Sequence, residues 1–150
     1  MNFEYSLDIP APYDHLWNLL EDIPRAARLM SGVDCMKAHD DGSYGAVLRI
    51  RIGPIGFNLS GTLRVTTDQH SGRWTMTVHA QDARTGGGVA STVETTIQER
   101  NQLLTNMTVK AKVQFLGRLG QLGQPLIKKK ADSMVQEFTE NLKNAAIADI

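Results

Sequence analysis

Four histidines and a single cysteine are the residues of this sequence most able to hold a metal ion or act in catalysis. His15, His39, His70 and His79 are not spaced as metal ligands on one helix, and none belongs to a recognised metal motif. Cys35 falls in an expected strand without an obvious histidine partner, so we expect it to be a small buried hydrophobic residue. The sequence therefore predicts no metal site.

A glycine run and scattered carboxylates are the next candidates for chemistry. Gly86, Gly87 and Gly88 are followed by neither a Lys-Ser/Thr pair nor a helix, so we expect a flexible strand edge or loop and no phosphate-binding loop. The sequence contains no nucleophile elbow and no catalytic triad. We predict no catalytic residue and no cofactor, and a ligand-binding or accessory protein, with enzymatic activity as an open alternative.

Three adjacent lysines form the most basic run of the chain: Lys128, Lys129 and Lys130. One interpretation is a solvated helix face. The other is contact with anionic lipid headgroups, where each lysine near the surface contributes about 1 kcal/mol. Three arginines could extend such a basic patch if their strands are neighbours: Arg49, Arg51 and Arg64.

Composition limits the classes of function. Sixteen basic and sixteen acidic side chains in 150 residues cancel to a formal net charge of zero, so bulk charge gives no argument for nucleic-acid binding. One cysteine excludes an internal disulfide, which fits a reducing compartment. No apolar run approaches the roughly 20 residues of a membrane span, and the N-terminus does not resemble a signal peptide. We expect a single domain over residues 1–150 in the cytoplasm, with peripheral contact at the inner face of the membrane as an open alternative.

The elements that must position any site begin with a strand over residues 2–9, where Phe3, Tyr5, Leu7 and Ile9 alternate with polar residues. Two short helices are expected next. The first follows Pro12, and the second covers residues 23–30 with Asp22 as its N-cap. Period two then returns in six strands separated by turn residues, which indicates an antiparallel meander: 33–38, 46–52, 57–65, 74–80, 89–97 and 107–115.

The longest helix is expected to begin near Pro125 and to run to the end of the chain. Its apolar residues recur at steps of three and four, which makes one stripe on a helix of period 3.6. The stripe consists of Leu126, Ile127, Ala131, Met134, Val135, Phe138, Leu142, Ala145 and Ala146. Because such a stripe needs a large apolar partner, we predict an α+β fold in which a seven-stranded antiparallel curved sheet wraps around this helix.

Several motifs along the chain resemble one family. They are Ile9–Pro10–Ala11–Pro12 with Leu16 and Trp17, then 29–33, then Ile52–Gly53–Pro54–Ile55, and last the segment Phe115–Leu116–Gly117–Arg118–Leu119–Gly120 with the three residues after it. On these residues the chain resembles the carbon monoxide dehydrogenase CoxG family, a branch of the START-like (SRPBCC), helix-grip superfamily. The family usually has proline where this sequence has Ser31.

The resemblance implies a helix-grip fold with an apolar cavity between sheet and helix. It also implies a role beside a molybdenum-containing carbon monoxide dehydrogenase or a related hydroxylase, such as binding a quinone-like lipid. It supplies no agreed catalytic residues for this sequence.

A largely apolar ligand between the concave sheet and the last helix is our leading hypothesis. Its motivation is the combination of apolar rows with small inward residues at Ala46, Gly61, Ala80, Ser91 and Ala111, although these could equally let helix and sheet pack closely. The predicted lining is Leu48, Ile50, Leu59, Trp74, Met76, Val78, Val93, Met107, Val109, Leu122, Met134 and Phe138.

Two other hypotheses stay open. The first is a cyclase- or hydrolase-type enzyme that uses polar groups in the cavity. Its candidates are the polar residues expected to reach inward or to the rim of the cavity: Tyr5, Ser91, Thr95 and Asn106. The second is an assembly or maturation factor that contacts the oxidoreductase through its surface.

Overall fold

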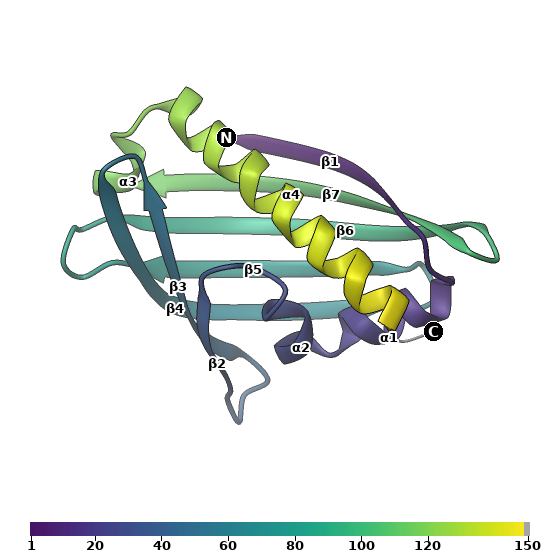
Figure 1. The fold of residues 1–150 in the computed structure, drawn as a ribbon. Coiled ribbons are helices and arrows are strands. Elements are labelled where there is room, and N and C mark those ends of the chain that lie inside the picture. The colour runs from purple at the N-terminus through teal and green to yellow at the C-terminus, as the bar shows by residue number, and fades with distance from the viewer. Residues whose placement is uncertain (149–150) are drawn as a thin grey trace.

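A seven-stranded antiparallel sheet and a long helix make up the computed structural model, which describes residues 1–148 apart from the side chain of Cys35. The expected burial of Cys35 and the last two residues of the expected helix therefore lie outside the described part. Figure 1 shows the helix crossing the concave face of the curved sheet. The elements are β1 (Asn2–Ile9), α1 (Tyr13–Glu21), α2 (Ile23–Ala27), β2 (Val33–Ala38), β3 (Tyr44–Ile52), β4 (Ile55–Asp68), β5 (Arg73–Gln81), β6 (Gly88–Asn101), β7 (Leu104–Leu116), α3 (Gly117–Gly120) and α4 (Gln124–Ala148).

The strands lie in the order β1-β7-β6-β5-β4-β3-β2, and every pair is antiparallel. From β2 to β7 each strand pairs with the next along the chain, as a meander requires. β1 instead pairs with β7, in a register that runs from Asn2 opposite Lys112 to Ile9 opposite Thr105. The alternating burial along β1 agrees with the period-two pattern. The predicted α+β fold class and the seven strands are confirmed.

Two helical segments differ from the sequence prediction. The Asp22 side chain caps α2 by accepting a hydrogen bond from Arg25 N at 3.3 Å, but α2 ends at Ala27 and not at residue 30. The next residues tighten into turns, in which Leu29 N donates to Ala26 O and Met30 N to Ala27 O. The predicted helix was too long because turns with hydrogen bonds from residue i to residue i−3 space apolar residues much as an α-helix does.

The short helix α3 is the second difference, since no pattern in the sequence predicted it. Gly117 begins it with a φ of 57°, a left-handed conformation that favours glycine. A Cβ on Gly117 would collide with the backbone oxygen of Gly86. Glycine therefore lets the chain leave β7 and pack α3 directly on the β5–β6 loop.

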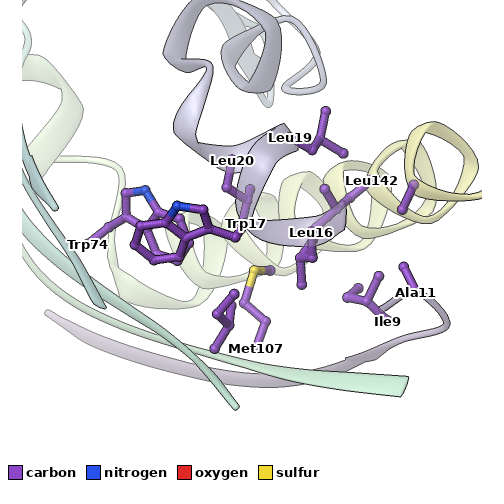
Figure 2. Packing of buried hydrophobic residues seen from close by; sticks show 11 residues of the cluster. Ile9, Ala11, Leu16, Trp17, Leu19, Leu20, Trp74, Met107 and Leu142 are labelled. Carbon is purple, nitrogen blue, oxygen red and sulfur yellow. The ribbon is translucent and has the colours of Figure 1, made fainter. Parts of the chain in front are cut away.

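The buried apolar residues form two separate clusters. The larger, which we call the α1 cluster, includes Trp17 of α1 and Trp74 of β5, whose ring centroids are 4.1 Å apart. Figure 2 shows these rings overlapping, with Leu142 of α4 among the buried side chains. The smaller, which we call the α3 cluster, consists of Ile52, Phe57, Leu59 and Leu119.

Candidate functional site

The concave face between the two clusters is the candidate site. Met76, Val78 and Val93 share the side of the sheet that carries Trp74, yet each is only half-buried. Met134, on the apolar stripe of α4, is also half-buried. None of the four belongs to either cluster. We call these four residues the open middle, because solvent reaches their apolar side chains between the sheet and α4.

The other residues of the predicted lining divide between the two closed ends. Trp74 and Met107 are buried in the α1 cluster, and Val109 and Phe138 pack against it. Leu59 is buried in the α3 cluster, and three more residues pack against that cluster: Leu48, Ile50 and Leu122. The structure thus places all the predicted residues on the inward side, and their role as ligand contacts stays a prediction.

A polar latch holds α4 to the edge strand β1. Tyr5 Oη donates a hydrogen bond to Asp132 Oδ1 at 2.8 Å, and Lys128 Nζ donates to Asp132 Oδ2 at 3.0 Å. The backbone of α4 also comes closer to α1, β1 and β3 than to the strands between them. The helix therefore rests on the two sides of the grip, which explains why the open middle keeps accessible surface.

The latch does not make Tyr5 a catalytic group at neutral pH. Burial, followed by the hydrogen bond and charge of Asp132, raises the pKa of Tyr5 to about 12. The Lys128 ammonium, followed by the Tyr5 hydroxyl, lowers the pKa of Asp132 below its ordinary value. A phenol that keeps its proton so strongly is a poor general acid or base near pH 7.

The remaining polar candidates for enzyme chemistry do not converge. The side-chain amide of Asn106 donates to Ser6 Oγ at 3.1 Å and to Asp8 Oδ1 at 3.0 Å, both on the outer face of β1. The expectation that Asn106 reaches inward or to the rim is therefore wrong, because its parity along β7 places it on the outer side. Ser91 and Thr95 face inward and are half-buried, without a side-chain hydrogen bond between them in the described structure.

The small inward residues have different causes. A Cβ on Gly61 would collide with the backbone oxygen of His79, so glycine is needed there for β4 and β5 to approach each other. Ala80 packs against the α3 cluster. Ala46, Ser91 and Ala111 stay half-buried. Close packing therefore explains Gly61 and Ala80. The half-buried residues are consistent with an enlarged space between sheet and helix.

The expected basic patch is divided. Lys128 is paired with Asp132, Lys129 is exposed and Lys130 is half-buried. Arg49 Nη2 lies 3.0 Å from Asp34 Oδ2, and Arg64 Nη2 lies 2.8 Å from Asp41 Oδ2. The proposed extension by these two arginines is therefore weakened by local ion pairs. Arg51 is separate, since Nη1 donates to the Pro54 carbonyl at 3.5 Å.

A hollow of about 460 Å³ at the α3 end was missed by the sequence analysis. Its walls come from the β3–β4 turn, the β5–β6 loop and α3, and they consist of Pro54, Ile55, Gly56, Arg84, Thr85 and Arg118. Two motifs that carry the family resemblance, the Gly-Pro turn and the Gly-Arg-Leu segment, meet here. These two motifs were the features of the sequence from which the hollow could have been inferred.

A buried carboxylate organises the β5–β6 loop beside this hollow. Asp82 is 3% exposed, and its oxygens accept hydrogen bonds from Asn58 N at 2.8 Å, Arg84 N at 2.9 Å and Thr85 N at 3.2 Å. The bond from Asn58 N is the largest cause of its lowered pKa. The loop expected to be flexible is thus held by a hydrogen-bond network that composition does not reveal.

Other polar features give no further site. A hollow of about 300 Å³ includes the outer-face residues Thr77, His79, Thr92 and Lys112, away from the open middle. Within residues 1–148, Cys35 excepted, no group of three or more His, Cys, Asp or Glu side chains is placed to hold a metal ion. Over the same residues, no helix is long and apolar enough to cross a membrane.

Comparisons with known proteins agree with this architecture. The family model for CoxG, described as a subunit of carbon monoxide dehydrogenase, matches residues 6–147. A conserved protein from Geobacillus kaustophilus superposes with a TM-score of 0.89 at 16% identity, over 99% of this chain and 96% of that chain. A START superfamily protein from Mycobacterium smegmatis superposes with a TM-score of 0.70 at 10% identity, over 99% of both chains.

The Zhui aromatase/cyclase from Streptomyces sp. R1128 superposes with a TM-score of 0.67 at 13% identity, over 99% of this chain and 92% of that chain. At these identities the structural likeness shows the fold alone, which is the START-like helix grip. No curated protein matches the sequence.

Proposed function

Because the chain belongs to the carbon monoxide dehydrogenase CoxG family, we propose that it binds a largely apolar, lipid- or quinone-like molecule in support of such an oxidoreductase. The observation that carries this proposal is the open middle. Met76, Val78, Val93 and Met134 face the space between sheet and helix but stay half-buried, while the clusters on both sides are closed.

The physical argument is that accessible apolar surface is unfavourable in water, at about 25 cal/mol for each Å². A folded chain normally buries such surface, but α4 rests on β1, β3 and α1 and leaves the apolar side chains of β5 and β6 partly accessible. An apolar ligand would cover it, and two methionines would let the lining adapt to the shape of that ligand. The polar latch at Tyr5 and Asp132 would then lie on one side of the bound molecule.

The partner enzyme in this proposal is a molybdenum hydroxylase-type carbon monoxide dehydrogenase. A carrier for a lipid-like molecule would also visit a membrane surface, and Lys129 and Lys130 are the members of the basic run without a carboxylate partner in the described structure. These two lysines and Lys128 form the membrane contact expected from the sequence.

Native mass spectrometry of the purified chain, followed by organic extraction, tests the binding proposal. A lipid or quinone at near-stoichiometric amount is the expected result. An apo mass, together with no uptake of an added apolar probe such as N-phenyl-1-naphthylamine, would overturn the proposal. That result would favour the hypothesis of an assembly factor, and the next measurement would be whether the dehydrogenase co-purifies with the chain.

A matched pair of variants locates the bound probe. Met76→Gln places a polar amide of similar length in the open middle, so we expect about tenfold weaker probe binding. Thr77→Gln, the neighbour on the outer face, should leave binding unchanged. Equal effects of the two variants would place the probe elsewhere.

A further inference from the structure

The end of the molecule at α3 combines cationic and apolar exposed side chains. The β3–β4 turn, the β5–β6 loop and α3 meet there around the hollow of about 460 Å³, with Arg84 and Arg118 in its walls. Figure 1 shows this end at the left, next to the start of α4. We call it the basic tip and define it by Arg51, Arg84, Leu116, Arg118 and Leu126.

The three arginines of the basic tip form no ion pair in the described structure. Arg84 is still close enough to Asp82 for its charge to contribute to the lowered pKa of that carboxyl, after the hydrogen bonds from backbone N–H groups. Arg84 Nη2 donates to the Gly56 carbonyl at 2.9 Å, and Arg51 donates to that of Pro54. The only nearby carboxylate in the loop, that of Asp82, is turned inward to backbone N–H groups. No carboxylate oxygen therefore contacts these guanidinium groups directly, and their outer N–H groups can meet an outside anion.

Three arginines elsewhere on the sheet are paired with carboxylates. Arg49 and Arg64 each form an ion pair with an aspartate, and Arg73 Nε lies 3.8 Å from Glu94 Oε1. Because the chain as a whole has zero net charge, its attraction for anions depends on such local differences. The basic tip is the place where arginines gather without acidic neighbours of this kind.

Two leucines project beside these arginines. Leu116 is 38% exposed and directly precedes α3, and Leu126 is 36% exposed. Leu126 Cδ2 lies 3.7 Å from the position that a Cβ of Gly53 would take, so it adjoins the β3–β4 turn. Leu116 is two residues from Arg118, and the turn that Leu126 adjoins follows Arg51. Exposed apolar side chains near cations suit the boundary between lipid headgroups and acyl chains.

We propose that the basic tip docks on the anionic surface of a lipid bilayer. Arg84 and Arg118 bind a headgroup phosphate at the hollow, Arg51 adds charge, and Leu116 and Leu126 enter the headgroup boundary. A bilayer fits better than an acidic protein surface because two separate leucines need only a fluid apolar layer and no matched pocket. The inference rests on the proposed carrier function, and it moves the main membrane contact from the lysine run to the α3 end.

Vesicle co-sedimentation with the full chain tests the inference. We expect binding to phosphatidylcholine vesicles that contain phosphatidylglycerol, and much weaker binding to phosphatidylcholine alone. Binding should fall as added salt shortens the Debye length from about 10 Å at 0.1 M to about 3 Å at 1 M. Leu116→Ser with Leu126→Ser should remove the part of the binding that resists salt.

A charge-matched pair of double variants makes the test specific. Arg84→Gln with Arg118→Gln should weaken binding to the anionic vesicles by about tenfold to thirtyfold. Arg64→Gln with Arg73→Gln changes the net charge equally but lies outside the basic tip, so it should have little effect. Arg118→Gln alone guards against misfolding, because its side chain makes no hydrogen bond within the described structure.

Three outcomes would overturn the inference: no vesicle binding, equal binding to both vesicle types, or equal losses in the two double variants. Capture of the chain by an acidic protein without vesicle binding would assign the tip to that partner instead. Uptake of N-phenyl-1-naphthylamine by the Arg84/Arg118 variant separates the two proposals. Normal uptake with lost vesicle binding supports docking at the tip, and failure of uptake in the wild-type chain counts against the carrier function.

Discussion

The α1 cluster and the open middle are both apolar and both lie between the sheet and helices, but they differ in closure. In the α1 cluster, α1 fills the space beside α4, so that Leu16 and Leu142 lose all contact with solvent. In the open middle only α4 crosses the sheet, and Met76 and Met134 stay half-buried. One end of the sheet therefore stabilises the fold, while the middle of the same sheet keeps apolar surface accessible.

The largest expected difference concerns two residues on the same stripe of α4. Leu142→Ala in the α1 cluster should lower the free energy of unfolding by about 2–5 kcal/mol, because a fully buried side chain leaves a cavity. Met134→Ala in the open middle should cost less than about 2 kcal/mol, since part of its surface already meets solvent. Denaturant unfolding of both variants measures the difference, and equal losses would mean that the middle is packed as tightly as the end.

The next effect comes from enlarging two alanines. Ala11→Met in the fully buried α1 cluster should cost about 1–3 kcal/mol through overpacking. Ala111→Met on the half-buried inward face of β7 should leave the unfolding free energy almost unchanged and should weaken binding of the apolar probe. Unfolding and probe titration check the pair. Strong destabilisation by Ala111→Met would contradict an open middle.

The smallest expected effect is on the pH dependence of stability, and it concerns two carboxylates: Asp82 at the α3 end and Asp132 beside the open middle. Backbone N–H groups, that of Asn58 first, hold the pKa of Asp82 below its ordinary value of 3.8, so its stabilising contribution is present above that pH and is lost as the pH falls through the lowered pKa. Asp82→Asn should therefore be less stable than wild type near neutral pH, with a gap that closes in acid.

Asp132→Asn is the matched variant for that comparison. Its pKa is also lowered, by Lys128 first, but the group is exposed, so its effect should be smaller and should shrink in salt. Urea unfolding at about pH 7 and about pH 3 compares the two carboxylates. A larger loss from Asp132→Asn would show that the latch matters more than the β5–β6 loop.

Much of the fold could be predicted because periodicity reports which side of an element meets the core. The alternation of Phe3, Tyr5, Leu7 and Ile9 identified the inward face of β1, and the stripe of α4 identified the face that meets the sheet. Periodicity does not report how closely two faces approach. For that reason Trp74 and Met76, two residues apart on β5, had the same pattern in the sequence but lie in different surroundings.

The basic tip could not be predicted because its parts are distant along the chain. Arg51, Arg84 and Arg118 meet only through the β3–β4 turn, the β5–β6 loop and α3, and α3 depends on the close approach that Gly117 allows. The adjacent lysines are the basic feature that the sequence makes evident. A helix nevertheless distributes consecutive residues around its axis, so the three lysines do not share one face. The hydrogen bond between Tyr5 and Asp132, which are 127 residues apart, is likewise visible only in space.

The pairing of β1 with β7 has a consequence for how the chain is made. β2 to β7 can pair one after another as they leave the ribosome, since each partner is the next strand. β1 leaves first, but Asn2 pairs with Lys112, so its apolar face must wait until more than a hundred further residues have been synthesised. During synthesis β1 can therefore complete the sheet only after β7 has been made, and the Tyr5–Asp132 hydrogen bond can form only after residue 132. Until then the apolar face of β1 has no partner strand, and it is a candidate for binding by molecular chaperones.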